Sequence, residues 1–426
     1  MSALLYTLGA FALILVLARV KVPLAIAIIA GAVGLGIAFG LGPRDIIRAA
    51  GLGVVQPMSI GLLTVTMLLL IISESMRQTG QLQDLVSLAG AFFRRPAITM
   101  AALPALIGLL PMPGGALFSA PMVQMASDGK PITAGHLSAI NYWYRHIWEH
   151  WWPLYPGVIL AMTLTAANPL TFAAYQIPVG LMMLLTGIPI LYSVHPSLHQ
   201  TAPPAPKGTA AKLAWAVSPI WVLLAVWLAA AGALQLLAPR LNPAWRDFLE
   251  KFGPISVGLL ACLLWTCRRG RVGFSHVARI AVNKTMGTLL ALVISVMIFQ
   301  YVLKMVDAAP KIRDELAAVH APILVMVIVL PFIAGMITGL AFGFVGVSFP
   351  LVLALIQGLG HPWAYIMLAY ASGHLGMMIS PLHLCYVVSN KYFNTPFTPV
   401  YRHLLLSVIL MAVCVAGYFI LLRIAF

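Results

Sequence analysis

Hydrophobic residues run through the chain in long, nearly uncharged windows separated by short polar segments. About 20 apolar residues in a helix are enough to cross the hydrocarbon layer of a membrane, which is about 30 Å thick. A membrane-spanning barrel would instead show short strands of alternating polarity. The pattern therefore predicts an all-α membrane protein with about ten transmembrane helices, near 3–18, 23–41, 53–76, 132–166, 170–192, 213–237, 253–267, 281–305, 361–390 and 401–425.

Two further apolar stretches, 97–127 and 321–357, are interrupted at their centres by proline and small residues. The first contains "LLPMPGGALFSAP" and the second "GLAFGFVGVSFP". A continuous helix through such a cluster would lose backbone hydrogen bonds at proline and conformational entropy at glycine. Each stretch is therefore predicted to form a re-entrant hairpin of two half-length helices, with its tip inside a protein-lined cavity.

A polar segment at 193–212 is the one predicted linker, and it divides the chain into halves at 1–192 and 213–426. Each half is predicted to hold three helices, a hairpin and two more helices. The hairpin tips "GGALFSAP" and "GFVGVSFP" align with each other, as do the following segments "RHIWEHWWPLYP" and "GHLGMMISPLHL". The coinciding pairs are Gly114/Gly343, Ser119/Ser348, Pro121/Pro350, His146/His374, Pro153/Pro381 and Leu154/Leu382.

Five full crossings per half would place the second half upside down, which predicts an inverted-topology repeat of the kind found in many secondary transporters. Lys and Arg are more numerous in the loops on the side that includes Arg94, Arg268 and Lys391. Positive residues concentrate in cytoplasmic loops, so both termini are predicted to lie on the periplasmic or extracellular side.

Composition supports this class: hydrophobic residues form 62% of the 426 and charged residues only 8%. The net charge of +15 would suggest nucleic-acid binding in a water-soluble protein. In a membrane protein the same excess belongs to the cytoplasmic loops, so we expect a lipid bilayer and no nucleic acid as partner. The four cysteines form no C-x-x-C pair and are read as small buried hydrophobic residues.

The segment "NYWYRHIWEHWWPLYPG" from 141 to 157 carries Arg145, His146, Glu149 and His150 near the centre of a predicted helix. Pro153 and Pro156 predict a helix break just after them, and Pro381 predicts the matching break in the second half. Ionisable groups at this depth usually mark a substrate or proton path. A buried ion pair between Arg145 and Glu149 that only holds helices together is the structural alternative.

The residues from His146 to His150 also spell H-x-x-E-H, a zinc-peptidase pattern. That site needs a third protein ligand, and the remaining acidic residues downstream lie in predicted loops. A zinc peptidase is therefore a remote alternative, and the sequence predicts neither an enzyme nor a resident metal or cofactor.

The hairpin tips suggest anion binding, since half-helices that begin at the membrane centre direct backbone amides and positive dipole ends into the cavity. Glycines there would let the backbone approach a ligand closely, or would simply allow close helix packing. The predicted substrate-binding residues are Gly114, Gly115, Ser119, Asn141, Arg145, Gly343, Gly346 and Ser348. The predicted proton-coupling residues are His146, Glu149, His150 and His374.

"LLPMPGGALFSAPMV" followed by "NYWYRHIWEHWWPLYPG" resembles the ion transporter superfamily of bacterial secondary carriers, most closely a ten-helix family within it that has no assigned substrate. The resemblance covers essentially the whole chain. It implies opposed hairpins, a substrate at their tips, and often a homodimer with an elevator motion. Sodium-coupled dicarboxylate relatives carry Ser-Asn-Thr signatures at the tips, and this sequence lacks them there, which favours protons over sodium as the coupling ion.

These observations predict a secondary active transporter of a small organic anion, a carboxylate, in the bacterial cytoplasmic membrane. The nearest alternative is an inorganic-ion carrier, either an oxyanion exporter or a cation/proton antiporter. Substrate identity, direction of transport and coupling stoichiometry are open at this stage.

Overall fold

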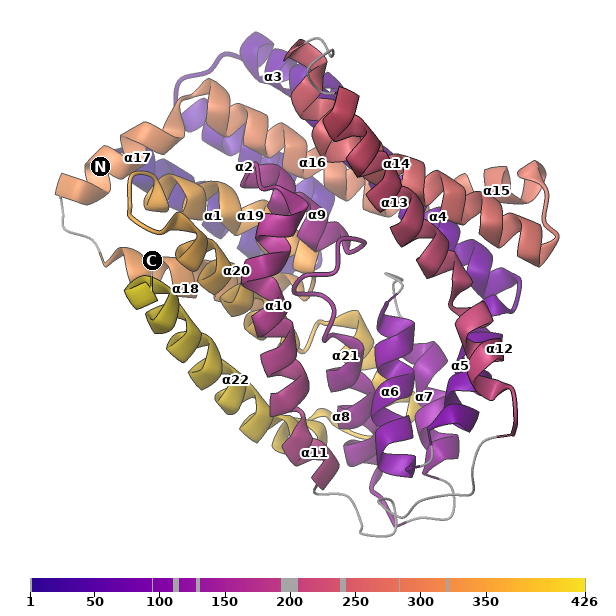
Figure 1. The fold of residues 1–426 in the computed structure, drawn as a ribbon. Coiled ribbons are helices and arrows are strands. Elements are labelled where there is room, and N and C mark those ends of the chain that lie inside the picture. Colours follow the sequence, from indigo (N-terminus) through magenta and orange to yellow (C-terminus); the bar gives the residue numbers. More distant parts are fainter. Residues whose placement is uncertain are drawn as a thin grey trace.

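The computed structural model describes residues 2–93, 95–109, 115–127, 131–192, 206–237, 243–282, 284–318 and 322–425. All regular secondary structure in these segments is helical (Figure 1). The first half of the chain holds α1 (Ser2–Arg19), α2 (Leu24–Ala38), α3 (Pro43–Val55), α4 (Pro57–Gln78), α5 (Gln81–Phe92), α6 (Pro96–Gly108), α7 (Ala116–Ala126), α8 (Ala134–Arg145), α9 (Pro156–Leu164), α10 (Pro169–Thr186) and α11 (Ile188–Tyr192).

The remaining helices follow in the rest of the chain, and the first of them, α12 (Thr209–Ala216), begins inside the predicted linker 193–212. The others are α13 (Ser218–Leu237), α14 (Pro243–Gly270), α15 (Phe274–Ala281), α16 (Lys284–Met305), α17 (Ala308–Ala318), α18 (Ile323–Thr338), α19 (Ala341–Ile356), α20 (Pro362–Met378), α21 (Leu384–Tyr392) and α22 (Phe397–Ala425).

The chain is an all-α membrane protein. Seven helical segments within the described residues are long and apolar enough to span a bilayer, and each coincides with a predicted window. The window 23–41 forms the shorter apolar helix α2. The windows 132–166 and 361–390 are not single helices, because each is divided into two short helices, α8–α9 and α20–α21.

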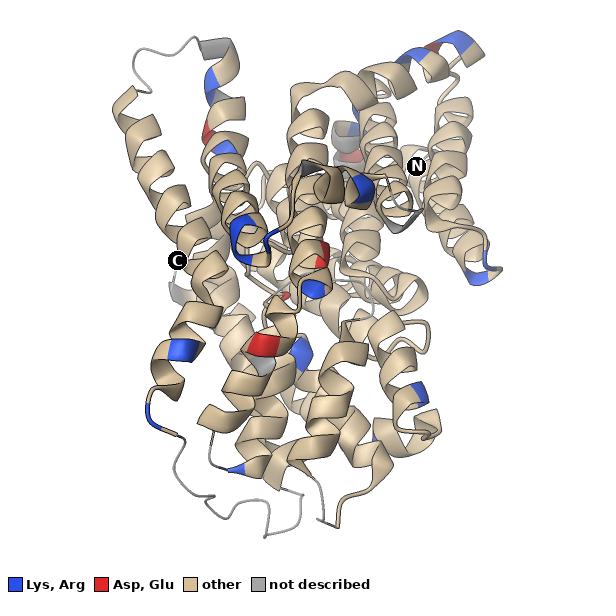
Figure 2. Ribbon diagram, turned by 90° about the vertical axis from the view of Figure 1, so that its right-hand side faces the viewer, with Lys and Arg blue, Asp and Glu red and all other residues tan. Residues whose placement is uncertain are grey.

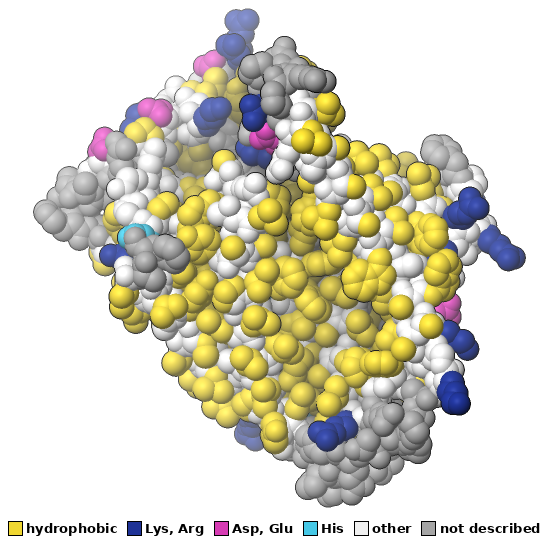
Figure 3. Space-filling view, viewed as in Figure 1, with side chains coloured by type: hydrophobic (Ala, Val, Ile, Leu, Met, Phe, Trp, Pro, Cys, Tyr) yellow, Lys and Arg dark blue, Asp and Glu magenta, His cyan; other side chains and the backbone are white. Residues whose placement is uncertain are grey.

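The outer surface fits a lipid environment. Figure 3 shows a broad hydrophobic face with Lys and Arg gathered at its margins. Large apolar side chains on α13 and α22, such as Leu228 and Val413, are more than half exposed. Most of the ribbon is free of charged residues (Figure 2), and exposed apolar area on this scale belongs against lipid or another membrane helix.

Both predicted hairpins appear as pairs of short apolar helices, α6 with α7 and α18 with α19, and the helices of each pair pack together. The tip of the first pair, residues 110–114, lies outside the described residues. The second pair turns at Gly339, whose φ of 63° is the left-handed conformation that glycine adopts readily at a helix C-terminus. Leu340 is extended, and α19 begins directly after it.

The packing between the two halves is reciprocal. Helix α2 packs on α16 and α14 packs on α4; likewise α9 packs on α19 and α21 packs on α7. Helices α8 and α22 are in contact, as are α20 and α10. If the two halves are equivalent units related by a two-fold axis, each contact between them occurs twice, with the two halves exchanged, and these pairs follow that rule. The repeat boundaries and the inversion of the second half relative to the membrane stay predictions.

Helices α18 and α20 cross where their backbones touch. A methyl group at Gly335 would overlap the carbonyl oxygen of Gly373, and a methyl at Gly376 would overlap the carbonyl oxygen of Phe332. Small residues at helix crossings allow this close approach in membranes. The crossing fixes α20, and therefore His374, against the second hairpin.

The Gly376→Ala substitution should lower the thermal unfolding temperature of the detergent-solubilised protein, because the backbone atoms of Phe332 cannot move aside as a flexible side chain could. We expect a cost of about 1–3 kcal/mol, typical of overpacking. The control is Gly417→Ala on α22, where a methyl group meets no heavy atom within 4 Å. Equal unfolding temperatures for the two variants would contradict the close backbone contact between α18 and α20.

Candidate functional site

The candidate site is built where the two divided helices are interrupted. Helix α8 ends at Arg145 and α9 begins at Pro156, so ten residues connect them without α-helix. The predicted proline break therefore starts earlier than Pro153. The amide of His146 bonds the carbonyl of Trp143, a tightened last turn, and the His146 Nδ1 atom lies 2.6 Å from the Tyr142 carbonyl.

The matching interruption in the second half is shorter, running from the end of α20 at Met378 to the start of α21 at Leu384, and it contains Pro381. The two interruptions face each other. Tyr142 donates to the Met378 carbonyl at 3.0 Å, and Tyr370 on α20 donates to the Glu149 carbonyl at 2.8 Å.

Glu149 is 8% exposed and lies between two imidazoles from different halves. One carboxylate oxygen is 3.8 Å from His146 Nε2, and the other is 3.8 Å from His374 Nε2. The ring of His150 packs on that of His374, with centroids 4.0 Å apart. The structure therefore brings together all four residues predicted to handle protons.

Arg145 is 2% exposed, and its guanidinium lies at the start of the first hairpin's second helix. A methyl group at Gly115 would come within 2.7 Å of Arg145 Nη1, so a larger residue there would require the guanidinium to shift. Asn141, one turn earlier on α8, donates to the Ala116 carbonyl at 3.0 Å and to Ser389 Oγ of α21 at 2.7 Å. Arg145 and Asn141 therefore both lie against the first hairpin.

The other predicted tip residues contact protein. Ser119 and Ser348 are fully buried, and their hydroxyls donate to the carbonyls of Ala116 and Phe344 in their own helices. Gly343 lies beside Thr338, and Gly346 lies against Val296 of α16. Gly114 lies outside the described residues.

The aromatic residues of the motif hydrogen-bond the end of α6. Trp148 Nε1 donates to the Ala105 carbonyl at 2.7 Å, Trp152 Nε1 donates to the Leu109 carbonyl at 3.0 Å, and the Tyr155 hydroxyl donates to the Gly108 carbonyl. The last carbonyls of a helix have no partner within the helix, and inside a membrane water cannot replace them. These side chains satisfy them.

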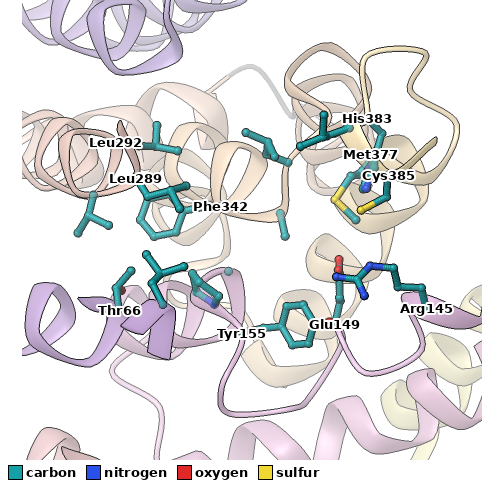
Figure 4. A pocket seen from close by; sticks show the side chains of 17 residues that line it. Thr66, Arg145, Glu149, Tyr155, Leu289, Leu292, Phe342, Met377, His383 and Cys385 are labelled. Atoms are coloured by element: carbon teal, nitrogen blue, oxygen red, sulfur yellow. The ribbon is translucent and has the colours of Figure 1, made fainter. Parts of the chain in front are cut away.

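A cavity of about 170 Å³ lies beside Arg145 and Glu149 (Figure 4). Three helices begin at its wall: α9 at Pro156, α19 at Ala341 and α21 at Leu384. Their N-cap residues, Tyr155, Leu340 and His383, make no side-chain capping hydrogen bond. First-turn amides and the positive ends of the helix dipoles therefore meet at this cavity.

A second cavity of about 570 Å³ lies at the other ends of α9 and α19. Its lining includes Leu164 and Thr165 at the end of α9, Ile356 at the end of α19, and Lys304 on α16. At the first cavity the starts of α9 and α19 touch, since a methyl group at Gly157 would come within 2.7 Å of the Ala341 Cβ. The helix pair therefore separates the two cavities.

His146, His383 and Cys385 could hold a metal ion, because their ligand atoms all lie within 4.8 Å of one another. Imidazole and thiolate are common zinc ligands. The His146 and His383 Nε2 atoms are 3.1 Å apart, which is also an ordinary hydrogen-bond distance. The H-x-x-E-H peptidase arrangement is not formed, since residues 146–151 make turns rather than one helical face.

The sequence interpretation missed His383 and Cys385. The alignment of the halves contains the signal, because His383 falls opposite Tyr155 at the spacing of 228 that relates His146 to His374. Cys385, read from sequence as a small buried hydrophobic residue, is indeed buried but lines the cavity. Thr66 on α4 also lines it, and no motif marks it.

Comparison with known proteins places the chain in a family. Residues 1–201 and 249–423 match the family model described as "Protein of unknown function (DUF401)", so the chain belongs to that family. No curated protein matches it. Among solved structures, Neisseria gonorrhoeae MtrF, whose title assigns it to "a Class of Antimetabolite Efflux Pumps", has 12% sequence identity and a TM-score of 0.54. The match covers 88% of this chain and 83% of MtrF, and it shows a shared fold.

Replacing Trp148 with Phe should lower the thermal unfolding temperature, because the substitution keeps the aromatic packing and leaves the Ala105 carbonyl without its donor. We expect a loss of about 1–3 kcal/mol, the cost of an unsatisfied buried polar group. Trp221→Phe on α13, where the side chain is 57% exposed, is the control and should leave the unfolding temperature unchanged. If Trp148→Phe behaves like Trp221→Phe, the indole does not cap α6.

Proposed function

We propose that the protein is a secondary active transporter of a small organic anion, a carboxylate, in the cytoplasmic membrane of a bacterium. The observation that carries the proposal is the position of Arg145, buried at a cavity where three helices without side-chain caps begin. Its membrane fold and its likeness to an efflux pump support transport.

The cavity favours an anion for two reasons. A guanidinium binds a carboxylate through paired, charge-assisted hydrogen bonds, and helix N-termini add oriented amides and partial positive charge. Discontinuous helices in transporters hold anionic substrates in this way near the middle of the membrane. The hairpin residues Gly115 and Ala341 to Gly343 would contribute to anion binding through their backbone groups rather than their side chains.

We further propose that the chain is a member of the ion transporter superfamily and works as a homodimer by an elevator motion, with two inverted repeats and both termini on the periplasmic side. The reciprocal packing of the halves supports the repeat. Two cavities at opposite ends of the touching pair α9–α19 support alternating access, because the contact between Gly157 and Ala341 lies between them.

We propose protons as the coupling ion, with Glu149 as the principal carrier and the histidines around it as partners. The aligned segments 115–121 and 343–350 contain none of the Asn and Thr that sodium-coupled relatives carry there, although Thr338 lies at the observed turn of the second hairpin. The titratable or charged groups that face Glu149 are Arg145, His146, Tyr155 and Cys385, with Tyr142, Tyr370, His374 and His383. His150 packs against His374. Both halves contribute them, so motion of one against the other would change the surroundings of the carboxylate.

Arg145→Gln should abolish uptake of the transported acid into proteoliposomes, while Arg145→Lys keeps a fraction of it. Loss of a charged hydrogen bond costs about 1.5–3 kcal/mol, or roughly ten-fold to a hundred-fold in affinity. The assay is radiolabelled uptake of a panel of organic acids under an imposed proton or sodium gradient. Undiminished uptake by Arg145→Gln would remove Arg145 from the substrate site.

Glu149→Gln should abolish uptake driven by a proton gradient and preserve exchange of labelled for unlabelled acid. The substitution keeps the size of the side chain and removes its proton-carrying capacity, whereas exchange requires only substrate binding and movement. Measuring both in the same proteoliposomes separates coupling from binding. Proton-driven uptake at the wild-type rate would exclude Glu149 as the carrier, and pH changes inside the vesicles without organic acid would indicate an inorganic-ion carrier.

A further inference from the structure

The cavity beside Arg145 has two chemically different ends. Figure 4 shows Arg145, Glu149, His383 and Cys385 together at one end, with Leu289, Leu292, Phe342 and Thr66 at the other. Leu70 and Val293 belong to the same lining. A ligand that fills the cavity therefore meets charge at one end and mainly hydrocarbon at the other.

The charge at the polar end matches one carboxylate. Arg145 is the only Lys or Arg side chain in the lining that the structure describes, and Glu149 lies beside it. A second carboxylate on the ligand would find no second Lys or Arg side chain in the described lining. It would meet Glu149, which repels it in its ionised form, the leucine wall, or helix N-terminal amides that supply only partial charge. A carboxylate without a partner in an apolar wall is strongly disfavoured.

The size of the cavity limits the body of the ligand. A cavity of about 150 Å³ lined by apolar side chains in another protein accepts benzene, and the present cavity has about 170 Å³. A single six-membered ring or a branched aliphatic chain is of the right size, and burial of each methylene group tightens binding about four-fold. A short polyhydroxy acid would leave its hydroxyl groups unpaired against leucine.

Thr66 is the one residue with a polar side chain at the apolar end in the described lining. Its side chain is 2% exposed, and its hydroxyl oxygen has no hydrogen-bond partner among the described residues. Buried hydroxyls are normally paired. The oxygen has almost no accessible surface as placed, so a rotation of the Thr66 side chain would bring the hydroxyl to a hydrogen-bonding atom on the ligand, at the end opposite its carboxylate.

Building on the proposed transport of organic anions, we infer that the substrate class is a compact monocarboxylate. It has an apolar ring or branched body and a hydrogen-bonding substituent far from the carboxylate. Arg145 with the helix N-termini binds the carboxylate, Leu289, Leu292 and Phe342 contact the body, and Thr66 selects the distal substituent.

The test measures dissociation constants by calorimetry on the purified full-length protein, with benzoate, 4-hydroxybenzoate, succinate and benzyl alcohol as probes. Benzoate should bind at least about ten-fold more tightly than succinate, and benzyl alcohol, which has no carboxylate, should not bind. The 4-hydroxybenzoate should bind about five-fold more tightly than benzoate, a typical gain for one neutral hydrogen bond.

Thr66→Val keeps the shape of the side chain and removes its hydroxyl. This variant should bind benzoate as the wild type does and lose the preference for 4-hydroxybenzoate. Leu292→Ala should weaken benzoate binding about ten-fold or more through lost apolar contact. Leu223→Ala on α13, an equally buried leucine outside the cavity, should leave the dissociation constants unchanged.

Two results distinguish failure of this inference from failure of the proposed function. Succinate binding more tightly than benzoate, with its affinity lost in Arg145→Gln, would overturn the monocarboxylate class and retain an organic-anion site. Absence of binding by every acid, or binding that Arg145→Gln leaves intact, would overturn both. A preference for 4-hydroxybenzoate that survives in Thr66→Val would overturn the role of Thr66.

Discussion

The structure depends on one constraint: a helix interrupted inside a membrane must find partners for its backbone groups within the protein. Helices α6 and α8 in the first half, and α18 and α20 in the second, end in the protein interior. Side chains satisfy their last carbonyls, with Trp148, Trp152 and Tyr155 serving α6. Tyr142 and Ser380 do the same for α20 and α18 through the carbonyls of Met378 and Met336.

The N-termini of the interior helices differ from these C-termini. The side chains at the starts of α9, α19 and α21 do not cap them, although all three lie at the same cavity. A helix start without a side-chain cap is common in the described part of the chain, as at α2, α4 and α6, so what distinguishes these three starts is their shared position at the cavity. The first-turn amides and helix dipole ends at its wall add positive character to the cavity beside Arg145.

The sequence predicts the fold well for two reasons. The length of an apolar window gives the length of its helix, and proline within the window shows that the helix is interrupted inside the membrane. Seven long helices, the two hairpins and the two divided helices all occupy their predicted windows. The earlier end of α8 at Arg145 could not be predicted from Pro153, because it depends on the contacts of Tyr142 and His146 with side chains and backbone far along the chain.

The site was predictable only in part, for the same reason. Ionisable residues are rare in an apolar chain, so the sequence alone identifies Arg145, Glu149 and the neighbouring histidines as candidates. The walls of the cavity consist of leucine, phenylalanine and threonine on α4, α16 and α19, which look like any other membrane-facing residues in sequence. Only the packing of the halves brings Leu292 and Thr66 to the same cavity.

The two halves contribute different chemistry to the same place. The first brings Arg145, Glu149 and the aromatic donors, whereas the second brings His374, His383, Cys385 and the close glycine crossing of α18 with α20. Neither half alone forms the cluster around Glu149, because the carboxylate has an imidazole neighbour from each half at the same distance. A rigid displacement that separated the halves would take His374 away from Glu149 and change the surroundings of the carboxylate. Division of the cluster between the halves therefore makes the surroundings of Glu149 depend on how the two halves pack against each other.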